Sequence, residues 1–219
     1  MVETRPGQGT FVVQRIDPFT TVLSDDISDL DVFVSKTQSS SGRNLQVIEP
    51  RVEIQRSEYE LAMQLGITVG KPVISRQQEL KIDGIPWALQ TTFYSLELVN
   101  QGAFRLIETV NLTDGDLAYL REATGVIQKS YCDLIMARSA NADEVSFFNL
   151  PGGYSQLNVF EIKRTAYDDA GRPIRLAVTI YPVDRNKFIY QGGPRPAVSN
   201  IQQTTDIPDD SHLNSGHDG

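Results

Sequence analysis

The sequence predicts an α+β fold, in which helices pack on an antiparallel sheet. Two observations carry this prediction: two stretches alternate like β-hairpins around strong turn signals, and a short helix with a capping pattern precedes each of them. Strands joined as hairpins run antiparallel, and short amphipathic helices must bury their apolar side against another element. We therefore expect one domain of this class from about residue 20 to residue 191.

The first half starts with an extended stretch, LQVIEPRVEIQ (45–55), that is typical of a strand. Ser57 and Glu60 follow in the S-x-x-E form of a capping box, in which two side chains bond free amides at the start of a helix. The next leucine, alanine and methionine residues predict a short amphipathic helix that ends near Gly66.

A hairpin completes the first half. Residues 73–82 and 87–94 alternate between apolar and polar side chains, as half-buried strands do. Asp83 and Gly84 lie between them, and this dipeptide is a strong signal for a tight turn. The first half is therefore expected to run in the order β-α-β-β.

The second half repeats this order. It starts with the strand KSYCDLIMARS (129–139) and continues with a second capping pattern at Asn141 and Glu144. A second pair of strands then surrounds the turn DDAGRP (168–173). The chain therefore contains two β-α-β-β half-repeats.

A further helix separates the two half-repeats. Thr113 is expected to cap a helix over residues 114–124, with Leu117 and Leu120 facing inward. Gly125 follows directly and predicts the end of that helix, because glycine readily adopts the left-handed conformation found there.

The two ends of the chain differ from this body. Thr10 to Val13 read as the second strand of a hairpin, with only residues 1–4 before the RPGQG turn. Residues 192–219 are polar and rich in Gly, Pro, Ser and Asp, so they predict a disordered tail. Both histidines, His212 and His217, belong to this tail, which argues against a metal site or histidine catalysis in the folded body.

Composition excludes several classes of protein. The net charge of −8 argues against broad non-specific binding of nucleic acid by this chain. The single cysteine, Cys132, excludes an internal disulfide and fits a reducing compartment, so we expect a cytoplasmic location. The sequence shows neither a membrane span nor a signal peptide. It also lacks the spacing of a phosphate loop, a nucleophile elbow or a zinc site, and we expect no cofactor.

Two segments carry a family resemblance, GITVGKPVISRQQELKIDGIPWALQTTFY (66–94) and FEIKRTAYDDAGRPIRL (160–176). They resemble the effector-binding domain of GntR-family transcription regulators of the HutC type, the UTRA domain, which has the chorismate lyase fold. The resemblance covers roughly residues 45 to 190. It implies a bacterial regulator that acts as a repressor and whose domain binds a small-molecule effector and forms a homodimer.

The resemblance also gives a reading of the N-terminus. In that family a winged helix-turn-helix precedes the domain, and its last wing strand is commonly written R-x-G-x-G-T-F-V, which Arg5 to Val12 match. The chain then reads as starting inside the wing, with Arg5 as a DNA contact of the intact protein. The expected organisation is a wing remnant, a linker with a first helix, the effector-binding domain and the tail: 1–13, 14–44, 45–191 and 192–219.

Candidate effector contacts follow from the resemblance and from strand alternation. Two phosphate-binding arginines of phosphosugar-binding members align with Gln78 and Leu80, so that pair is absent here. Two family acids align with Gln90 and Arg175, while a family tyrosine is matched by Tyr181. The full set of candidate contacts is Arg76, Gln78, Gln90, Thr92, Asp116, Arg138, Arg175 and Tyr181. These polar residues also have explanations without a ligand. They are a solvated sheet face for the strand residues, a favourable helix dipole at Asp116 and a structural ion pair at Arg138.

The resulting functional hypothesis is an effector-sensing domain with no enzymatic activity. We expect a small polar effector, carrying a carboxylate or another weak anion at Arg175 unless Asp116 neutralises that arginine, and we do not expect a sugar phosphate. Operator DNA is expected to bind only through the winged domain. The alternative is a chorismate lyase-like enzyme acting on a small carboxylate substrate, because one fold serves several functions.

Overall fold

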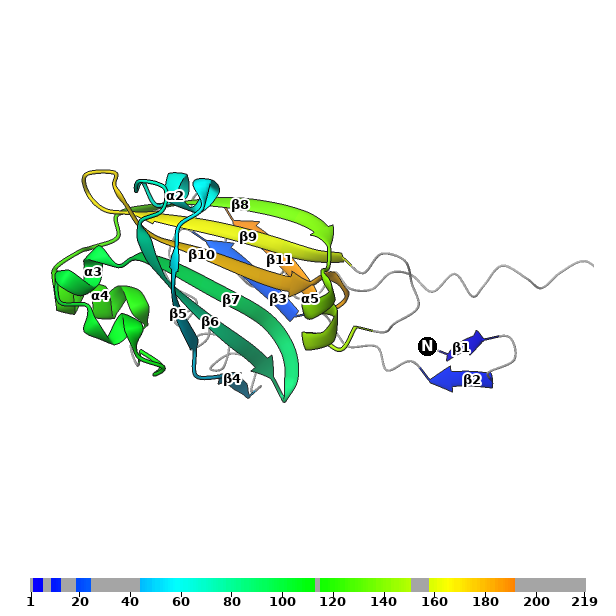
Figure 1. The fold of residues 1–219 in the computed structure, drawn as a ribbon. Helices are drawn as coiled ribbons and strands as arrows, with labels where there is room; N and C mark the ends of the chain where they lie inside the picture. The colour runs from blue at the N-terminus through cyan, green and yellow to red at the C-terminus, as the bar shows by residue number, and fades with distance from the viewer. Residues whose placement is uncertain are drawn as a thin grey trace, which may run out of the picture.

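A seven-stranded sheet forms the main body of the protein (Figure 1). The structure is a computed structural model, and it describes residues 2–5, 9–12, 19–24, 44–112, 115–150 and 158–191. The strand order is β4-β6-β7-β10-β9-β8, and β5 also pairs with β6. The bounds are β4 Leu45–Val47, β5 Arg51–Arg56, β6 Pro72–Ile82, β7 Ile85–Ser95, β8 Ser130–Ser139, β9 Asn158–Tyr167 and β10 Pro173–Pro182.

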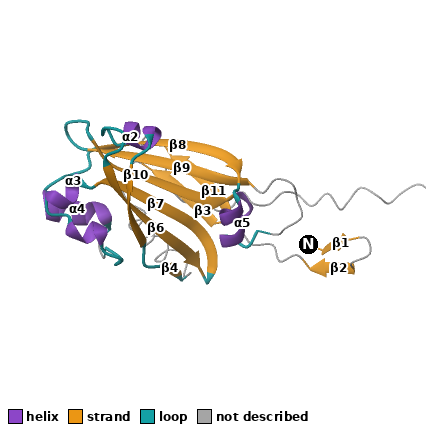
Figure 2. Cartoon of the chain, in the orientation of Figure 1, coloured by secondary structure: helices purple, strands orange, loops and turns teal. Residues whose placement is uncertain are grey.

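All pairs within this sheet are antiparallel, which confirms the predicted α+β class. The helices are short and lie around the sheet (Figure 2). They are α2 Tyr59–Gln64, α3 Glu97–Asn100, the 3-10 helix η1 Phe104–Ile107, α4 Asp116–Thr124, α5 Ala142–Phe147 and the 3-10 helix η2 Val183–Arg185. None of the helices in the described ranges is long and apolar enough to cross a membrane.

The two β-α-β-β half-repeats are confirmed as β5-α2-β6-β7 and β8-α5-β9-β10. Asp83 and Gly84 form the turn between β6 and β7 with positive φ angles of 51° and 79°, as a tight hairpin turn requires. The first strand stretch, 45–55, is divided into β4 and β5 around Pro50, because proline cannot donate a hydrogen bond to a ladder.

Of the two predicted capping boxes, the structure confirms the one at Asn141 and contradicts the one at Ser57. Asn141 forms the capping box at α5, since its side chain accepts from the backbone of Glu144 while Glu144 accepts from the backbone of Asn141, both at 2.9 Å. The capping box at Ser57 is wrong: α2 starts after Glu58 without a side-chain cap, and the Ser57 hydroxyl lies 3.4 Å from the carbonyl of Thr68 instead.

Helix α4 starts later than predicted and ends as predicted. Its N-terminal boundary is Gly115, and Thr113, the expected cap, lies outside the described residues. Gly125 ends the helix in the left-handed conformation, at a φ of 76°. Leu120 is fully buried and Leu117 packs with it, so the inward face is the expected one.

Two short pairings lie outside the main sheet. Strand β1 (Val2–Arg5) pairs antiparallel with β2 (Gly9–Val12), so the first strand of the N-terminal hairpin is supplied by residues 2–5 of the chain itself. Strand β3 (Phe19–Ser24) pairs in parallel with β11 (Asn186–Gln191), which joins the two ends of the folded body. The expected tail at 192–219 lies outside the described residues.

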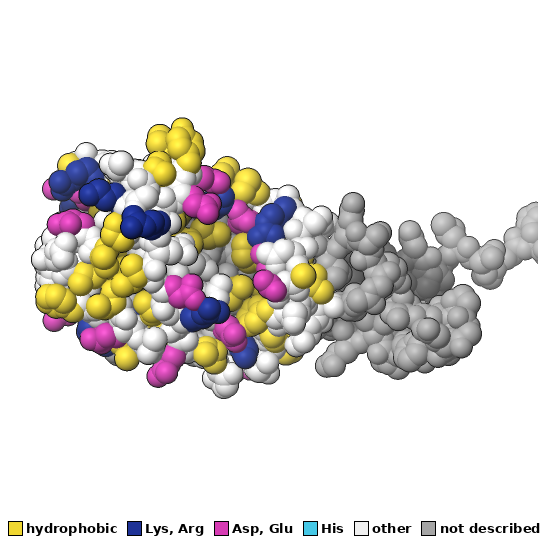
Figure 3. Space-filling model, in the orientation of Figure 1, with side chains coloured by type: hydrophobic (Ala, Val, Ile, Leu, Met, Phe, Trp, Pro, Cys, Tyr) yellow, Lys and Arg dark blue, Asp and Glu magenta, His cyan; other side chains and the backbone are white. Residues whose placement is uncertain are grey.

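The sheet has two faces with different covers. One face, here called the α2 face, packs against α2 and α5 and carries Leu176, Val178 and Ile180 of β10. The opposite face, here called the α4 face, packs against α3, η1 and α4 at one end and against Phe188 of β11 at the other. Figure 3 shows the α2 face, where acidic and basic side chains lie beside one another.

Candidate functional site

A row of polar side chains crosses the middle of the α4 face, and we call it the polar belt. It comes from the central strands β6, β7 and β10, where alternation turns every second side chain toward the same face. Its members are Arg76, Gln78, Gln90, Thr92, Arg175 and Thr179. Gln78 lies opposite Gln90, and Gln90 lies opposite Thr179, so three strands bring these side chains together. Sequence alternation predicted this face correctly.

Apolar clusters close the polar belt at both ends. At one end Ile74 and Tyr94 pack with Leu106 of η1 and Leu120 of α4. At the other end Tyr181 packs edge-on against Trp87 and Phe188, at centroid distances of 5.5 and 5.0 Å. Burial raises the pKa of the Tyr181 hydroxyl far above its usual value. Tyr181 therefore contributes an aromatic wall beside the belt.

Arg76 ties the sheet to the segment after η1. Its guanidinium donates to the carbonyls of Arg105 (3.1 Å), Leu106 (2.8 Å), Glu108 (2.8 Å) and Val110 (2.7 Å). Burial lowers the pKa of this guanidinium, and the carbonyl dipoles compensate for the lost hydration. Arg76 is thus the anchor of a loop that borders the belt.

Arg175 and Asp116 form an ion pair beneath α4. The Arg175 side chain is 3% exposed, and its Nη1 donates to Asp116 Oδ1 at 2.5 Å. The other oxygen of Asp116 accepts from the hydroxyl of Tyr94 on β7. Of the two partners considered for Arg175, the protein's own acid therefore occupies the position that an anionic effector would need.

A second ion pair extends the polar belt onto β9 and β8. Arg164 donates to both carboxylate oxygens of Asp133, at 2.7 and 2.6 Å, and its guanidinium stacks 4.1 Å from the ring centroid of Tyr131. Arg164 lies opposite Ala177 of β10, so it shares the α4 face. The sequence analysis missed this pair, although the alternation of 158–167 would have placed Arg164 on that face.

The amide of Gln90 is buried and only partly used. The residue is 6% exposed, its Nε2 donates to the Thr92 hydroxyl at 3.0 Å, and its buried Oε1 accepts no hydrogen bond from the residues that the structure describes. If the amide were turned over, its nitrogen would be the unused end, so one end lacks a partner in either orientation. Gln78, beside it, donates to Asn111 at 3.0 Å.

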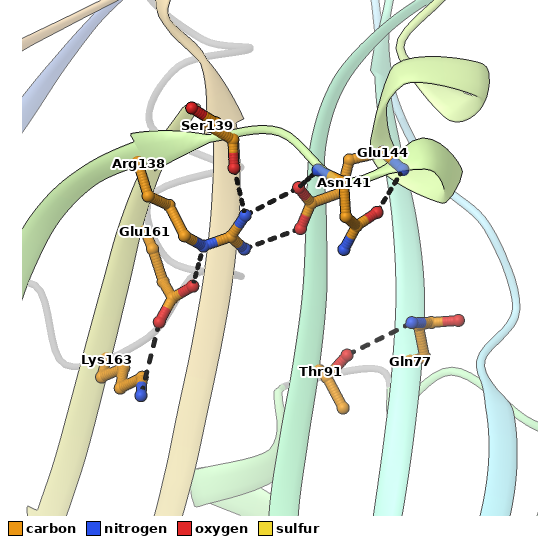
Figure 4. A network of polar contacts seen from close by, with 8 residues as sticks. All are labelled: Gln77, Thr91, Arg138, Ser139, Asn141, Glu144, Glu161 and Lys163. Carbon is orange, nitrogen blue, oxygen red and sulfur yellow. Dashed lines mark hydrogen bonds and ion pairs between the residues drawn. The ribbon is translucent and has the colours of Figure 1, made fainter. Parts of the chain in front are cut away.

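Arg138 lies apart from the other candidate residues. It projects from β8 onto the α2 face, where it donates to both carboxylate oxygens of Glu144 at 2.8 and 2.7 Å and to Glu161 at 2.5 Å (Figure 4). These carboxylates raise the pKa of the guanidinium further above its usual value. The competing explanation, a structural ion pair, describes this arrangement.

Other features of the described structure do not converge on the polar belt. Arg5 belongs to β1, and its side chain is outside the described part. A recess of about 350 Å³ lies on the α2 face, between α2 and the sheet, and holds Lys163 and Phe93 but none of the candidate contacts. Among the described residues there is no group of three His, Cys, Asp or Glu side chains that could hold a metal ion.

Comparison with known proteins identifies relatives of this arrangement. The family model of the UTRA domain matches residues 41–187. Comparison with the curated proteins gives no match.

Solved structures share the fold. The effector domain of PhnF from Mycobacterium smegmatis has a TM-score of 0.61 and 22% identity, over 74% of this chain and 94% of that one. A GntR-family transcriptional regulator from Bacillus cereus has a TM-score of 0.55 and 19% identity, over 68% of this chain and 97% of that one. The C-terminal domain of YurK from Bacillus subtilis has a TM-score of 0.58 and 19% identity, over 66% of this chain and 96% of that one.

Proposed function

The chain belongs to the UTRA domain family. From that premise we propose that it is the sensing domain of a GntR regulator of the HutC type. It binds a small polar effector in the polar belt, and this binding changes the affinity of the regulator for DNA. The observation that carries the location is Gln90, a buried amide with one unused end. An unsatisfied buried polar atom costs roughly 1–3 kcal/mol. A ligand that bonds this amide removes that penalty.

The neighbours of the belt suggest how binding is transmitted. Arg76 holds the segment after η1, and the Arg175–Asp116 pair holds the start of α4. An effector that touches the belt therefore acts beside two connections to segments outside the sheet. If the effector and DNA bind preferentially to different arrangements of these segments, binding of the effector lowers the affinity for DNA. Binding of DNA then lowers the affinity for the effector by the same factor.

The enzymatic alternative receives less support from the geometry. Chorismate lyase-like chemistry needs a carboxylic acid close to cationic groups that hold substrate carboxylates. The acids that border the belt, Asp116 and Asp133, are both engaged by arginines. We therefore propose a binding domain without catalysis.

A ligand screen with matched variants tests the location. Thermal shift with a library of small polar metabolites should identify stabilising compounds, and Gln90→Leu should abolish their effect. Gln77→Leu is the control, because Gln77 is exposed on the neighbouring strand and its side chain makes a single hydrogen bond in the described part, to Thr91 at 3.4 Å. Compounds that stabilise Gln90→Leu as strongly as the wild type would show that the belt is not the site.

We also propose that the domain forms a homodimer through the edge strand β8. This strand has ten residues, β9 covers only one side of it, and Leu134 is 50% exposed. An uncovered strand of this length is a template for pairing with a second chain. A two-fold dimer also suits a palindromic operator.

Sedimentation of two matched variants tests the dimer. Leu134→Arg should yield a monomer at micromolar concentration, whereas Ile54→Arg, on the opposite edge strand β5, should remain dimeric. A wild-type monomer would contradict the proposal. We further propose that the protein is a bacterial repressor located in the cytoplasm, and that Arg5 belongs to a DNA-binding wing.

A further inference from the structure

We infer that the effector of the polar belt is an uncharged molecule, recognised through hydroxyl or amide groups. This inference rests on the proposed function and adds the chemical class of the ligand. It follows from how each charged group around the belt is already engaged, and from which groups are left to bind.

The guanidinium of Arg76 is engaged by backbone carbonyls. Arg76 lies opposite Thr92, and its Nη1 and Nη2 donate to four carbonyls between residues 105 and 110. Binding an anion through these nitrogens would require the loss of those bonds. Each freed carbonyl would then need a new partner.

The other two arginines are neutralised by carboxylates. Asp116 meets Arg175, and Asp133 meets Arg164 through two bonds. The two carboxylate oxygens of Asp133 occupy the positions on the Arg164 guanidinium that the oxygens of an anionic ligand would take. An added anion would also face the charge of each carboxylate, and like charges at short range disfavour binding.

The groups that remain for a ligand are neutral. The unused end of the Gln90 amide on β7 lies opposite Thr179 of β10. The Thr179 hydroxyl bonds Tyr181 and, being both a donor and an acceptor, can form a further bond. An amide and a hydroxyl complement ligand groups that both donate and accept, such as hydroxyls and carboxamides. A carboxylate or phosphate only accepts, so it would use fewer of these groups and lose its own hydration.

The test asks whether Asp116 keeps anions out. Wild type and Asp116→Asn are titrated with inorganic phosphate and with acetate, at constant ionic strength in chloride, and the thermal shift is recorded. We expect little response from the wild type. In the variant Arg175 lacks the carboxylate of Asp116 and becomes an anion site, with an apparent affinity at least about tenfold higher, because charge-assisted bonds are about twice as strong as neutral ones.

Either of two results would overturn the inference. One is a wild type that responds to phosphate or acetate as strongly as the variant. The other is a folded variant that gains no response, since Asp116 would then not be the group that excludes anions. Glu97→Gln serves as a control for the general effect of removing an acid, because Glu97 of α3 accepts a hydrogen bond from the amide of Asn100.

A second arm uses only wild-type protein and matched ligand pairs, so it does not depend on the folding of Asp116→Asn. The pairs are glucose against glucose 6-phosphate and acetamide against acetate. The neutral member of a pair should stabilise the protein more than the charged member does. A stronger response to the charged member contradicts the inference.

Gln90→Leu distinguishes the failure of the inference from the failure of the proposed function. If charged probes bind and Gln90→Leu abolishes their effect, the belt is the effector site but its ligand is an anion. If the effects of both classes persist in Gln90→Leu, the effector site lies elsewhere and the proposed function fails at this location. Gln77→Leu again serves as the matched control on the opposite face.

Discussion

The two faces of the sheet each hold an arginine that is paired with acidic side chains, two for Arg138 and one for Arg175, in different surroundings. On the α2 face the side chain of Arg138 is 33% exposed, and Glu144 binds it while also completing the capping box of α5. On the α4 face the side chain of Arg175 is almost fully buried, and Asp116 also accepts from Tyr94. The first network holds a helix start, whereas the second lies beside a buried amide that the fold does not satisfy.

This difference distinguishes polar groups that stabilise the fold from polar groups that can still bind a ligand. Each nitrogen of the Arg138 guanidinium donates to an acceptor, and the network continues through Glu161 to Lys163 (Figure 4). Lys163 also pairs with Glu60 at 2.8 Å. On the α4 face the charges are paired but Gln90 is not satisfied. Buried polar atoms without partners are rare in folded proteins, and they often mark a functional position.

The largest effect is expected from breaking the buried pair of the α4 face. Asp116→Ala leaves the Arg175 charge buried, and removing one partner of such a pair costs roughly 3–5 kcal/mol of unfolding free energy. Urea unfolding at neutral pH measures this loss. The double change Asp116→Ala with Arg175→Met should recover much of it, because no unpaired charge remains. A single variant as stable as the wild type would mean that the pair is not buried in solution.

A smaller effect is expected from the network of the α2 face. Arg138→Met should cost about 1–2 kcal/mol, since hydrogen bonds to charged groups are strong but the guanidinium is partly solvated. Burial by itself raises the pKa of Glu144, but bonds from Arg138 and the backbone of Asn141 outweigh this, so the pKa lies below its ordinary value of 4.5.

The pH dependence of that effect has a definite sign. A carboxylate with a lowered pKa stabilises the fold above its unfolded pKa, and this contribution is lost as the pH falls through the folded pKa. The stability difference between wild type and Arg138→Met should therefore be present at pH 7 and shrink below about pH 4.5. Unfolding curves at pH 7 and pH 3 measure it, and a difference that grows in acid would contradict the assigned network.

The two helix starts of the α2 face should differ in a third experiment. Asn141→Ala removes a capping side chain and should cost about 1 kcal/mol. Ser57→Ala, at the corresponding position of the other half-repeat, should cost less than about 0.5 kcal/mol, because its hydroxyl makes a single long contact and caps no helix. Equal losses in thermal unfolding would show that α2 is capped after all.

The smallest effect on stability is expected at the belt. Gln90→Leu removes a buried amide with an unused end, so the unfolding free energy should stay within about 1 kcal/mol of the wild type or rise slightly. Urea unfolding of Gln90→Leu and of the wild type measures this. A loss above about 2 kcal/mol would mean that the amide is satisfied in the fold, and Gln90 would then no longer indicate a ligand site.

Local signals in the sequence are enough to predict the strands and helices of the two half-repeats and their order. Alternation and the Asp83-Gly84 turn predict the β6–β7 hairpin, because these signals act between neighbouring residues. The same alternation assigns Gln78, Gln90 and Thr92 to one face, since the strand period does not depend on distant contacts. The family resemblance added the fold type on the basis of residues spread over both half-repeats.

The hydrogen-bond and ion-pair partners of the polar side chains became known from the tertiary structure alone. Arg175 and Asp116 are 59 residues apart, and Arg164 meets Asp133 from 31 residues away. The two capping patterns look alike in sequence, but only Asn141 is the residue at which its helix starts. Helix α2 starts after Glu58, one residue later than the pattern predicts, and the Ser57 hydroxyl lies 3.4 Å from the carbonyl of Thr68. Hydrogen bonds over such separations depend on how strands and helices are packed, and local periodicity carries no information about that packing.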